Sequence, residues 1–209
     1  MTAVTALIRP LLCLLAPVLV LCATASGQSD PSADLVAVEG RFGSIEWRPG
    51  VGVDQYRRIA LLDVHVALRD NWLRDHNRGK RGFNEVTEED KANVIAAVAN
   101  EFTEHFTATL EQQGEFRINE VVGAADLLLL RPAILNVSIP PSTYGSQGLS
   151  PESSFIGMTL YLELYDSATS TLIGRIVDGQ TEQDQGRRTV QRIFRRWAEE
   201  LHTFLKEDF

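Results

Sequence analysis

Side chains that commonly carry catalysis or bind metal ions are few and scattered in this chain of 209 residues. On one predicted helix Glu101 and His105 share a face, and near the C-terminus Glu199 and His202 have the spacing found in di-iron helix bundles. Neither pair has the further ligands that a metal ion needs. The sequence therefore predicts no metal site and no cofactor.

The short motifs of nucleophilic and phosphate chemistry are also missing from the sequence. A serine stands between glycines at 145–148, but no strand–turn–helix context surrounds it, and the glycines at 79–82 lack the spacing of a phosphate loop. We therefore expect no catalytic residues. An enzyme of unrecognised type stays as the alternative, with His65 or His105 in a cleft. Otherwise His65 is interpreted as a hydrogen-bonded core residue.

The chain is acidic, with a formal charge of −8 and an isoelectric point near 5.0, which argues against a nucleic-acid partner. A first basic cluster nevertheless interrupts it at 69–84. This segment is either a solvated loop or a surface for an anionic lipid, a glycan or an acidic protein, because arginine binds carboxylate and phosphate groups in a bidentate manner. The candidate loop residues are Trp72, Arg74, Arg78, Lys80 and Arg81, together with Tyr144 from the Pro/Ser/Gly-rich loop 140–154.

A second basic cluster occupies the first half of the last predicted helix. Positive charge at a helix N-terminus opposes the helix dipole, so it needs compensation, and Asp178, Glu182 and Asp184 lie just upstream. The cluster is therefore either an internal charge network or a docking face for a partner. The candidate patch consists of Arg187, Arg188, Arg192, Arg195 and Arg196.

The N-terminus has the pattern of a secretory signal peptide. One basic residue, Arg9, precedes the apolar run 11–22, which is too short to cross a bilayer and is followed by small residues ending at Ala25. We expect cleavage after Ala25 and a periplasmic or secreted protein. A lipid anchor at Cys22 is not expected, because Leu21 stands where a lipoprotein needs a small residue. A buried core helix or an uncleaved anchor are the other readings.

Hydrophobic periodicity predicts one α/β (α+β) domain over 51–209, after a flexible leader at 26–50. The segment 36–49 inside that leader is expected to drape over the domain, pinned by Phe42, Ile45 and Trp47. We predict a mixed four- to five-stranded sheet with two long amphipathic helices packed on it, in the order β-α-(β)-β-β-β-α. The expected strands are 58–68, 116–120, 125–139, 157–166 and 171–181, and the expected helices are 87–114 and 187–206.

Several of these segments resemble a known family. They are Tyr56-Arg57-Arg58-Ile59 opening a strand, the strand 126–131 closing in Pro132-Ala133-Ile134, the hairpin 162–170, and Trp197-Ala198-Glu199-Glu200-Leu201. Over about residues 56–205 the chain resembles the bacterial envelope family "domain of unknown function thirty-three thirteen". More distantly, it is similar to TolB amino-terminal-like domains of envelope accessory lipoproteins.

The resemblance implies an exported or lipid-anchored protein of Gram-negative bacteria that serves in assembly or interaction. It carries no catalytic residues to this sequence, because the family has none that are agreed. Two departures from the family pattern stand out. The chain has no lipobox, and the hairpin tip reads Thr169-Ser170 in place of Thr-Gly.

These observations together predict an exported, non-catalytic envelope binding or assembly module whose partner is an envelope protein or an anionic surface. The alternatives are the unrecognised enzyme and a membrane-apposed protein that uses its arginine clusters. A flat patch of arginine and aromatic side chains would favour the module, whereas an acidic cleft with a perturbed histidine would favour the enzyme.

The signal peptide is tested by mass spectrometry of the exported protein. We expect Ser26 as the first residue, because the small residues before it fit the signal peptidase pocket. A diacylated Cys22, or a chain that retains residues 1–25, would contradict this prediction.

Overall fold

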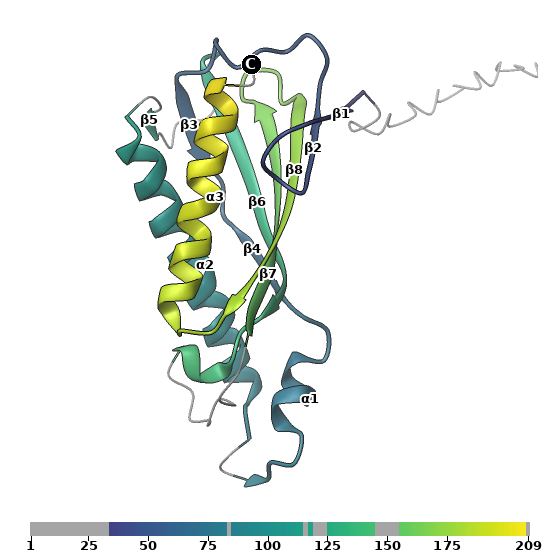
Figure 1. The fold of residues 1–209 in the computed structure, drawn as a ribbon, viewed down its shortest axis with the longest axis vertical. Coiled ribbons are helices and arrows are strands. Elements are labelled where there is room, and N and C mark those ends of the chain that lie inside the picture. The colour runs from purple at the N-terminus through teal and green to yellow at the C-terminus, as the bar shows by residue number, and fades with distance from the viewer. Residues whose placement is uncertain (1–33, 83–84, 115–116, 119–124, 145–154, 208–209) are drawn as a thin grey trace, which may run out of the picture. The chain divides into compact units, whose positions relative to one another are not determined.

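The computed structural model describes residues 34–82, 85–114, 117–118, 125–144 and 155–207. Within these residues the chain forms one mixed β-sheet and three α-helices (Figure 1). The α+β class predicted from the sequence is therefore confirmed. The predicted signal peptide, Cys22 and the serine at 145–148 lie outside the described residues.

The sheet contains eight strands among the described residues, more than the four or five predicted. They are β1 (Val36–Val38), β2 (Ser44–Trp47), β3 (Arg58–Leu61), β4 (His65–Leu68), β5 (Arg117–Ile118), β6 (Leu127–Ser138), β7 (Phe155–Asp166) and β8 (Leu172–Gln183). Their order is β1-β2-β8-β7-β6-β3-β5, and β4 also pairs with β6. As expected, β3 and β6 are parallel, and β7 and β8 form an antiparallel hairpin.

Two features make the sheet larger than predicted. The segment expected to drape over the domain instead forms β1 and β2, which extend the sheet beyond β8. Its side chains Phe42, Ile45 and Trp47 are buried, as expected. In addition, the single strand predicted over 58–68 is divided into β3 and β4, both parallel to β6.

The division between β3 and β4 falls opposite Pro132. Along the same edge of β6, Leu130 before the proline is the partner of Leu61 in β3, and Ala133 after the proline is the partner of His65 in β4. Pro132 has no amide proton to donate, so a break in the neighbouring strand here costs no ladder hydrogen bond from this residue. We expected Pro132 to mark a kink or an edge, but β6 lies inside the sheet, between β7 and the β3–β4 pair.

The first long helix, α2 (Glu88–Gln112), begins where the sequence predicts. The Thr87 hydroxyl accepts a hydrogen bond from the Asp90 amide at 3.1 Å, and the Asp90 carboxylate accepts one from the Thr87 amide at 2.9 Å. This capping box satisfies amide groups that the first turn leaves without helical partners. Gly114, with φ of 78°, follows the end of the helix.

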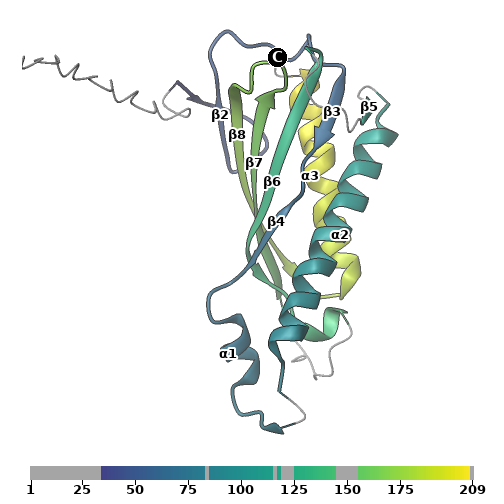
Figure 2. The ribbon, with the colours of Figure 1, turned by 180° about the vertical axis from the view of Figure 1, so that it is seen from behind.

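The second long helix, α3 (Arg187–Glu207), packs beside α2 on one face of the sheet (Figures 1 and 2). Phe102 of α2 meets Phe194 of α3 edge to face, with ring centroids 5.3 Å apart. The apolar stripes of both helices and alternate residues of the strands form one buried cluster. The predicted pairing of two amphipathic helices with a common sheet is therefore confirmed.

A shorter helix, α1 (Trp72–Asn77), lies inside the segment predicted as a charged loop. A 3-10 turn, η2 (Pro141–Tyr144), follows β6. In the part of the chain that the structure describes, none of the helices combines the length and the apolar character needed to cross a membrane.

The contact between Gly174 and Trp47 supplies a test of the β2–β8 pairing. A Cβ atom on Gly174 would overlap Cε3 and Cζ3 of the Trp47 ring, which is 2% exposed. We expect Gly174→Ala to lower the free energy of unfolding by about 1–3 kcal/mol in urea denaturation, as overpacked cores do.

Gly179→Ala, on the same strand, is the matched control. A Cβ there comes no closer than 4.0 Å to another residue, so we expect no loss and a gain of up to about 1 kcal/mol. Equal effects of the two substitutions would contradict the packing of Trp47 on β8.

Candidate interaction surface

The sheet face opposite α2 and α3 is called here the open face. Along β7 the residues Leu160, Leu162 and Leu164 are buried toward the helices, so the residues between them must point the other way. In Figure 2 the strands β6, β7 and β8 are seen with no helix of the described chain in front of them. The central part of the open face consists of Arg131, Ala133 and Leu135 of β6, Thr159, Tyr161, Glu163 and Tyr165 of β7, Arg175, Val177 and Gly179 of β8, and Ser44 and Glu46 of β2.

Charges alternate across four strands of the open face. The pairing register places Arg131 opposite Glu163, Glu163 opposite Arg175, and Arg175 opposite Glu46. The nearest nitrogen–oxygen distances are 3.4 Å, 3.9 Å and 2.9 Å in that order. Directly opposed unlike charges stabilise strand pairs, so these four side chains, called the charged row, support the register from β6 to β2.

Glu163 is the centre of this surface. The hydroxyl groups of Tyr161 and Tyr165 donate hydrogen bonds to its carboxylate at 3.1 Å and 2.9 Å. The guanidinium of Arg175 lies over the Tyr161 ring, 5.7 Å from its centroid. The side chain of Glu163 is only 13% exposed, whereas that of Arg131 is 65% exposed. The carboxylate is thus covered by its own partners, and the arginine and tyrosine side chains form the accessible surface.

Burial and the neighbouring carboxylate raise the pKa values of both tyrosines. For Tyr161 the larger cause is burial and the next is the charge of Glu163; for Tyr165 burial is followed by the hydrogen bond to Glu163. Both shifts favour the protonated phenol. The two hydroxyl groups therefore remain hydrogen-bond donors at neutral pH.

His65 also belongs to the open face, because its partner in β6 is Ala133. The residue is exposed, so its interpretation as a hydrogen-bonded core histidine is wrong. That interpretation assumed a strand covered on both faces, whereas the helices of the described residues cover one face only.

The arginines of the candidate patch lie along α3, and two of them bind a single carboxylate of β8. Arg192 donates to Oε2 of Glu182 through Nε at 2.8 Å and Nη2 at 2.5 Å. Arg196 donates to Oε1 of Glu182 at 2.6 Å and to Gln180 at 2.7 Å. Glu182 was named from the sequence as a compensating acid, and the geometry agrees with the internal charge network.

Arg187 binds a different acid that the sequence did not indicate as its partner. Its Nε donates at 2.5 Å to Glu101 of α2, which is 4% exposed, and Tyr144 donates to the same carboxylate at 3.2 Å. The pKa of Arg187 is raised, chiefly by this hydrogen bond, and that of Tyr144 is raised by burial and then by Glu101. The structure thus brings together Arg187 of the patch and Tyr144 of the loop.

The other two arginines of the patch, Arg188 and Arg195, are exposed and form no ion pair with another described residue. The five arginines therefore do not act as one free basic surface.

The candidate loop is divided between core and surface. Trp72 is 1% exposed, and its indole nitrogen donates to the Ile139 carbonyl at 2.8 Å, so it is a core residue. Arg74 and Arg78 are exposed and lie 3.7 Å and 3.5 Å from Asp75, respectively. Lys80 is half-buried and Arg81 is exposed.

The remaining histidines lie apart from one another. His76 accompanies Trp72 in α1, and its pKa is lowered by burial and further by Lys80 and Arg69. His105 is half-buried on α2 and His202 is buried on α3. Among the described residues no three histidine, cysteine or acidic side chains converge in the way that a metal ion requires.

Comparison with known proteins places the chain in no family. No protein-family model matches it, and no curated protein is similar to it. The resemblance to the domain of unknown function therefore stays a prediction.

Solved structures give remote matches. The PelC dodecamer from Paraburkholderia phytofirmans is 12% identical, with a TM-score of 0.40 over 77% of this chain and 97% of that one. The hypothetical protein CT253 from Chlamydia trachomatis is 9% identical, with a TM-score of 0.42 over 72% of this chain and 98% of that one. A putative neuraminyllactose-binding hemagglutinin homolog from Helicobacter pylori is 8% identical, with a TM-score of 0.34 over 76% and 87%. Identities and scores this low support no statement about the function of this chain.

The charged row can be tested through the tyrosine pKa values. Glu163→Gln removes the negative charge beside both phenols, so we expect the pKa values of Tyr161 and Tyr165 to fall toward the ordinary value. Ultraviolet absorbance titration of tyrosinate, or NMR of labelled tyrosine, measures the shift.

Arg131→Gln is a control that should shift the pKa of Tyr165 in the opposite direction. Arg131 lowers the pKa of Tyr165, so its removal should raise that pKa further. Unchanged titration in Glu163→Gln, or shifts of the same sign in both variants, would show that the carboxylate does not hold these hydroxyl groups.

Proposed function

We propose that the chain is an exported, non-catalytic binding or assembly module of the bacterial envelope, and that it meets a protein partner through the open face. Export rests on the signal-peptide pattern of residues 1–25. The observation that carries the binding role is the group of tyrosine and arginine side chains on a sheet face that none of the described helices covers. Tyrosine and arginine are the residues that contribute most at protein interfaces.

The charges of the open face favour a protein over an anionic surface. The charged row contains two arginines and two glutamates, so its formal charge is zero. An anionic lipid or glycan surface attracts an excess of positive charge, which this face does not offer. A protein with complementary alternating charges would gain orientation from the row, since paired charges fix register more than they add affinity.

The pairing within the open face also lowers the cost of docking. Burying an unpaired charge at an interface costs several kcal/mol, and a charge that already has a partner avoids much of that cost. Glu163 is already satisfied by two phenols and two arginines. A partner could therefore cover Tyr161 and Tyr165 without leaving that carboxylate bare.

The arginines of α3 support the docking role less well. Arg192 and Arg196 share Glu182, and Arg187 is bound to Glu101, so three of the five already serve packing within the domain. A membrane-apposed protein that uses these arginines would have to release them from their acids. We therefore place the partner on the sheet and not on the N-terminal end of α3.

In-cell photocrosslinking tests the proposal. A photoreactive phenylalanine analogue at Tyr161 should give a discrete protein adduct in the envelope fraction, and the same analogue at Thr103, exposed on α2, should not. Adding Arg131→Glu should abolish the adduct through charge repulsion with the partner. The substitution also sets two carboxylates opposite each other on β6 and β7, so we expect a small fall in the melting temperature of a protein that remains folded.

Three outcomes would count against the proposal. They are equal adducts from both positions, no adduct from Tyr161, and adducts with phospholipid in place of protein. The last would favour the membrane-apposed alternative.

A further inference from the structure

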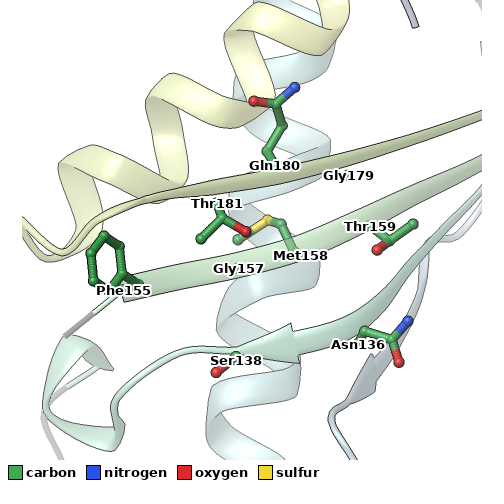
Figure 3. A pocket seen from close by; sticks show the side chains of 9 residues that line it. All are labelled: Asn136, Ser138, Phe155, Gly157, Met158, Thr159, Gly179, Gln180 and Thr181. Carbon is green, nitrogen blue, oxygen red and sulfur yellow. The ribbon is translucent and has the colours of Figure 1, made fainter. Parts of the chain in front are cut away.

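A hollow of about 450 Å³ opens at one end of the sheet, where β6, β7 and β8 lie side by side (Figure 3). It continues the open face beyond the charged row but shares no residue with that row. Its volume is within the range of about 300–1,000 Å³ that small-molecule sites occupy.

Two glycines on adjacent strands leave the space. In the β7–β8 register Gly157 lies opposite Thr181, and Gly179 lies opposite Thr159. Neither glycine has a positive φ. A Cβ added to Gly157 would lie 3.5 Å from the Thr181 hydroxyl, and a Cβ added to Gly179 would lie 4.0 Å from the Thr159 hydroxyl, each the nearest atom. Backbone conformation and packing therefore do not require glycine at either position, although glycine weakens a strand.

A bulge in β6 forms the border of the hollow that lies across from β8. The pairing of β6 with β7 shifts between Leu135 and Ser138, and Asn136 within this step has a φ of 53°. Asparagine tolerates this left-handed conformation better than most residues. Figure 3 shows the Asn136 amide and the Ser138 hydroxyl along this border, across from β8.

The lining combines one exposed aromatic ring with neutral polar groups. Phe155 is 61% exposed, and only it and Val36 are exposed large hydrophobic residues in the described part of the chain. The polar lining groups include the amide of Asn136 and the hydroxyls of Ser138, Thr159 and Thr181. None of these four side chains forms a hydrogen bond with another described residue, and none of the described residues that line the hollow is charged.

We propose that this hollow binds a neutral saccharide, with one sugar ring against Phe155 and its hydroxyl groups directed to the polar lining. A pyranose has a face of C–H bonds that packs on an aromatic ring. Its edge carries hydroxyl groups that both donate and accept, as do the serine, threonine and asparagine side chains here. An acidic sugar or a nucleotide would need a cation to offset its charge, and the described part of the lining offers none.

The two glycines then have a purpose, because a side chain at either position would occupy the space of the sugar. Thr159 and Gly179 belong to the central part of the open face, but the site uses none of the residues of the charged row, so it can be tested separately from the proposed protein partner.

Saturation-transfer and amide-shift NMR test the inference on the purified protein. The probes are maltose, cellobiose and N,N′-diacetylchitobiose, with digalacturonate as the acidic comparison. We expect at least one neutral disaccharide to receive saturation and to shift the amide signals of Gly157 and Thr181. Digalacturonate should bind at least tenfold more weakly.

Three variants separate the site from a general effect on folding. Gly179→Val fills the hollow with a residue that strands favour, and Phe155→Ala removes the exposed ring. Each should weaken binding at least tenfold, with a melting temperature no lower than that of wild type for Gly179→Val. Val36→Ala, which removes the other exposed apolar side chain, should leave binding unchanged.

The inference is overturned if no neutral disaccharide binds, if Gly179→Val binds as wild type does, or if digalacturonate binds best. Arg131→Glu should retain saccharide binding. If the protein crosslink is absent and the saccharide binds, the saccharide site is supported and the protein interface is not. If the crosslink forms and no saccharide binds, the protein interface is supported and the saccharide site is not.

Discussion

The two-residue period of β7 decides where each side chain of interest lies. Alternate leucines from Leu160 to Leu164 fill the space under α2 and α3, so Tyr161 and Glu163 between them must face away from the helices. A slip of one residue would put a carboxylate into the apolar cluster and leucines into water. The hydrophobic register therefore fixes the open face as firmly as it fixes the core. The charged row then confirms the same register from the polar side, through pairs that reach from β6 to β2.

The same period along β8 explains how α3 is held. Asp178, Gln180 and Glu182 lie on the helix side of β8 and meet Trp197, Arg196 and Arg192 in turn. Gln180 and Glu182 are two residues apart on the strand, about 6.6 Å, and Arg196 and Arg192 are four residues apart on the helix, a rise of about 6 Å, so these two contacts stay in step.

These contacts keep six polar side chains satisfied near the edge of the core. Ion pairs with Glu182 of β8 and with Glu101 of α2 also offset the charges of Arg192, Arg196 and Arg187, three of the five arginines in the first half of α3. Asp178 extends the connection to the residue before β2, since its carboxylate accepts from the indole of Trp197 at 2.7 Å and from the Gly43 amide at 3.0 Å.

The sequence was sufficient to predict those parts of the fold that depend on interactions between residues close together in the chain. The cap at Thr87, the alternation along β7 and the stripe of α3 each depend on residues a few positions apart, and each was found. The β2–β8 pairing was missed, because Glu46 and Arg175 are 129 residues apart and four-residue strands give little periodicity.

The errors over single residues have a common physical cause. The polarity of a side chain does not reveal what tertiary packing places over it. Trp72, surrounded by basic residues, was assigned to a surface and is buried against the Ile139 carbonyl. His65, in an apolar strand, was assigned to the core and is exposed. Glu101 was considered only as a metal ligand, and its ion pair with Arg187 depends on how two helices pack.

The open face and the hollow beside it also show how one sheet can serve two kinds of contact. At the charged row the side chains are large and bind one another, so the surface is prearranged and offers few free hydrogen-bonding groups. At the hollow the strands carry glycine, serine and threonine beside Phe155, and the Asn136 amide and the hydroxyls of Ser138, Thr159 and Thr181 form no hydrogen bond with another described residue. A protein docks on groups that are already held in place, whereas a sugar needs groups that are still free. Along β7, the part with Tyr161 and Glu163 is therefore suited to a protein partner, and the part with Thr159 and Gly157 is suited to a sugar.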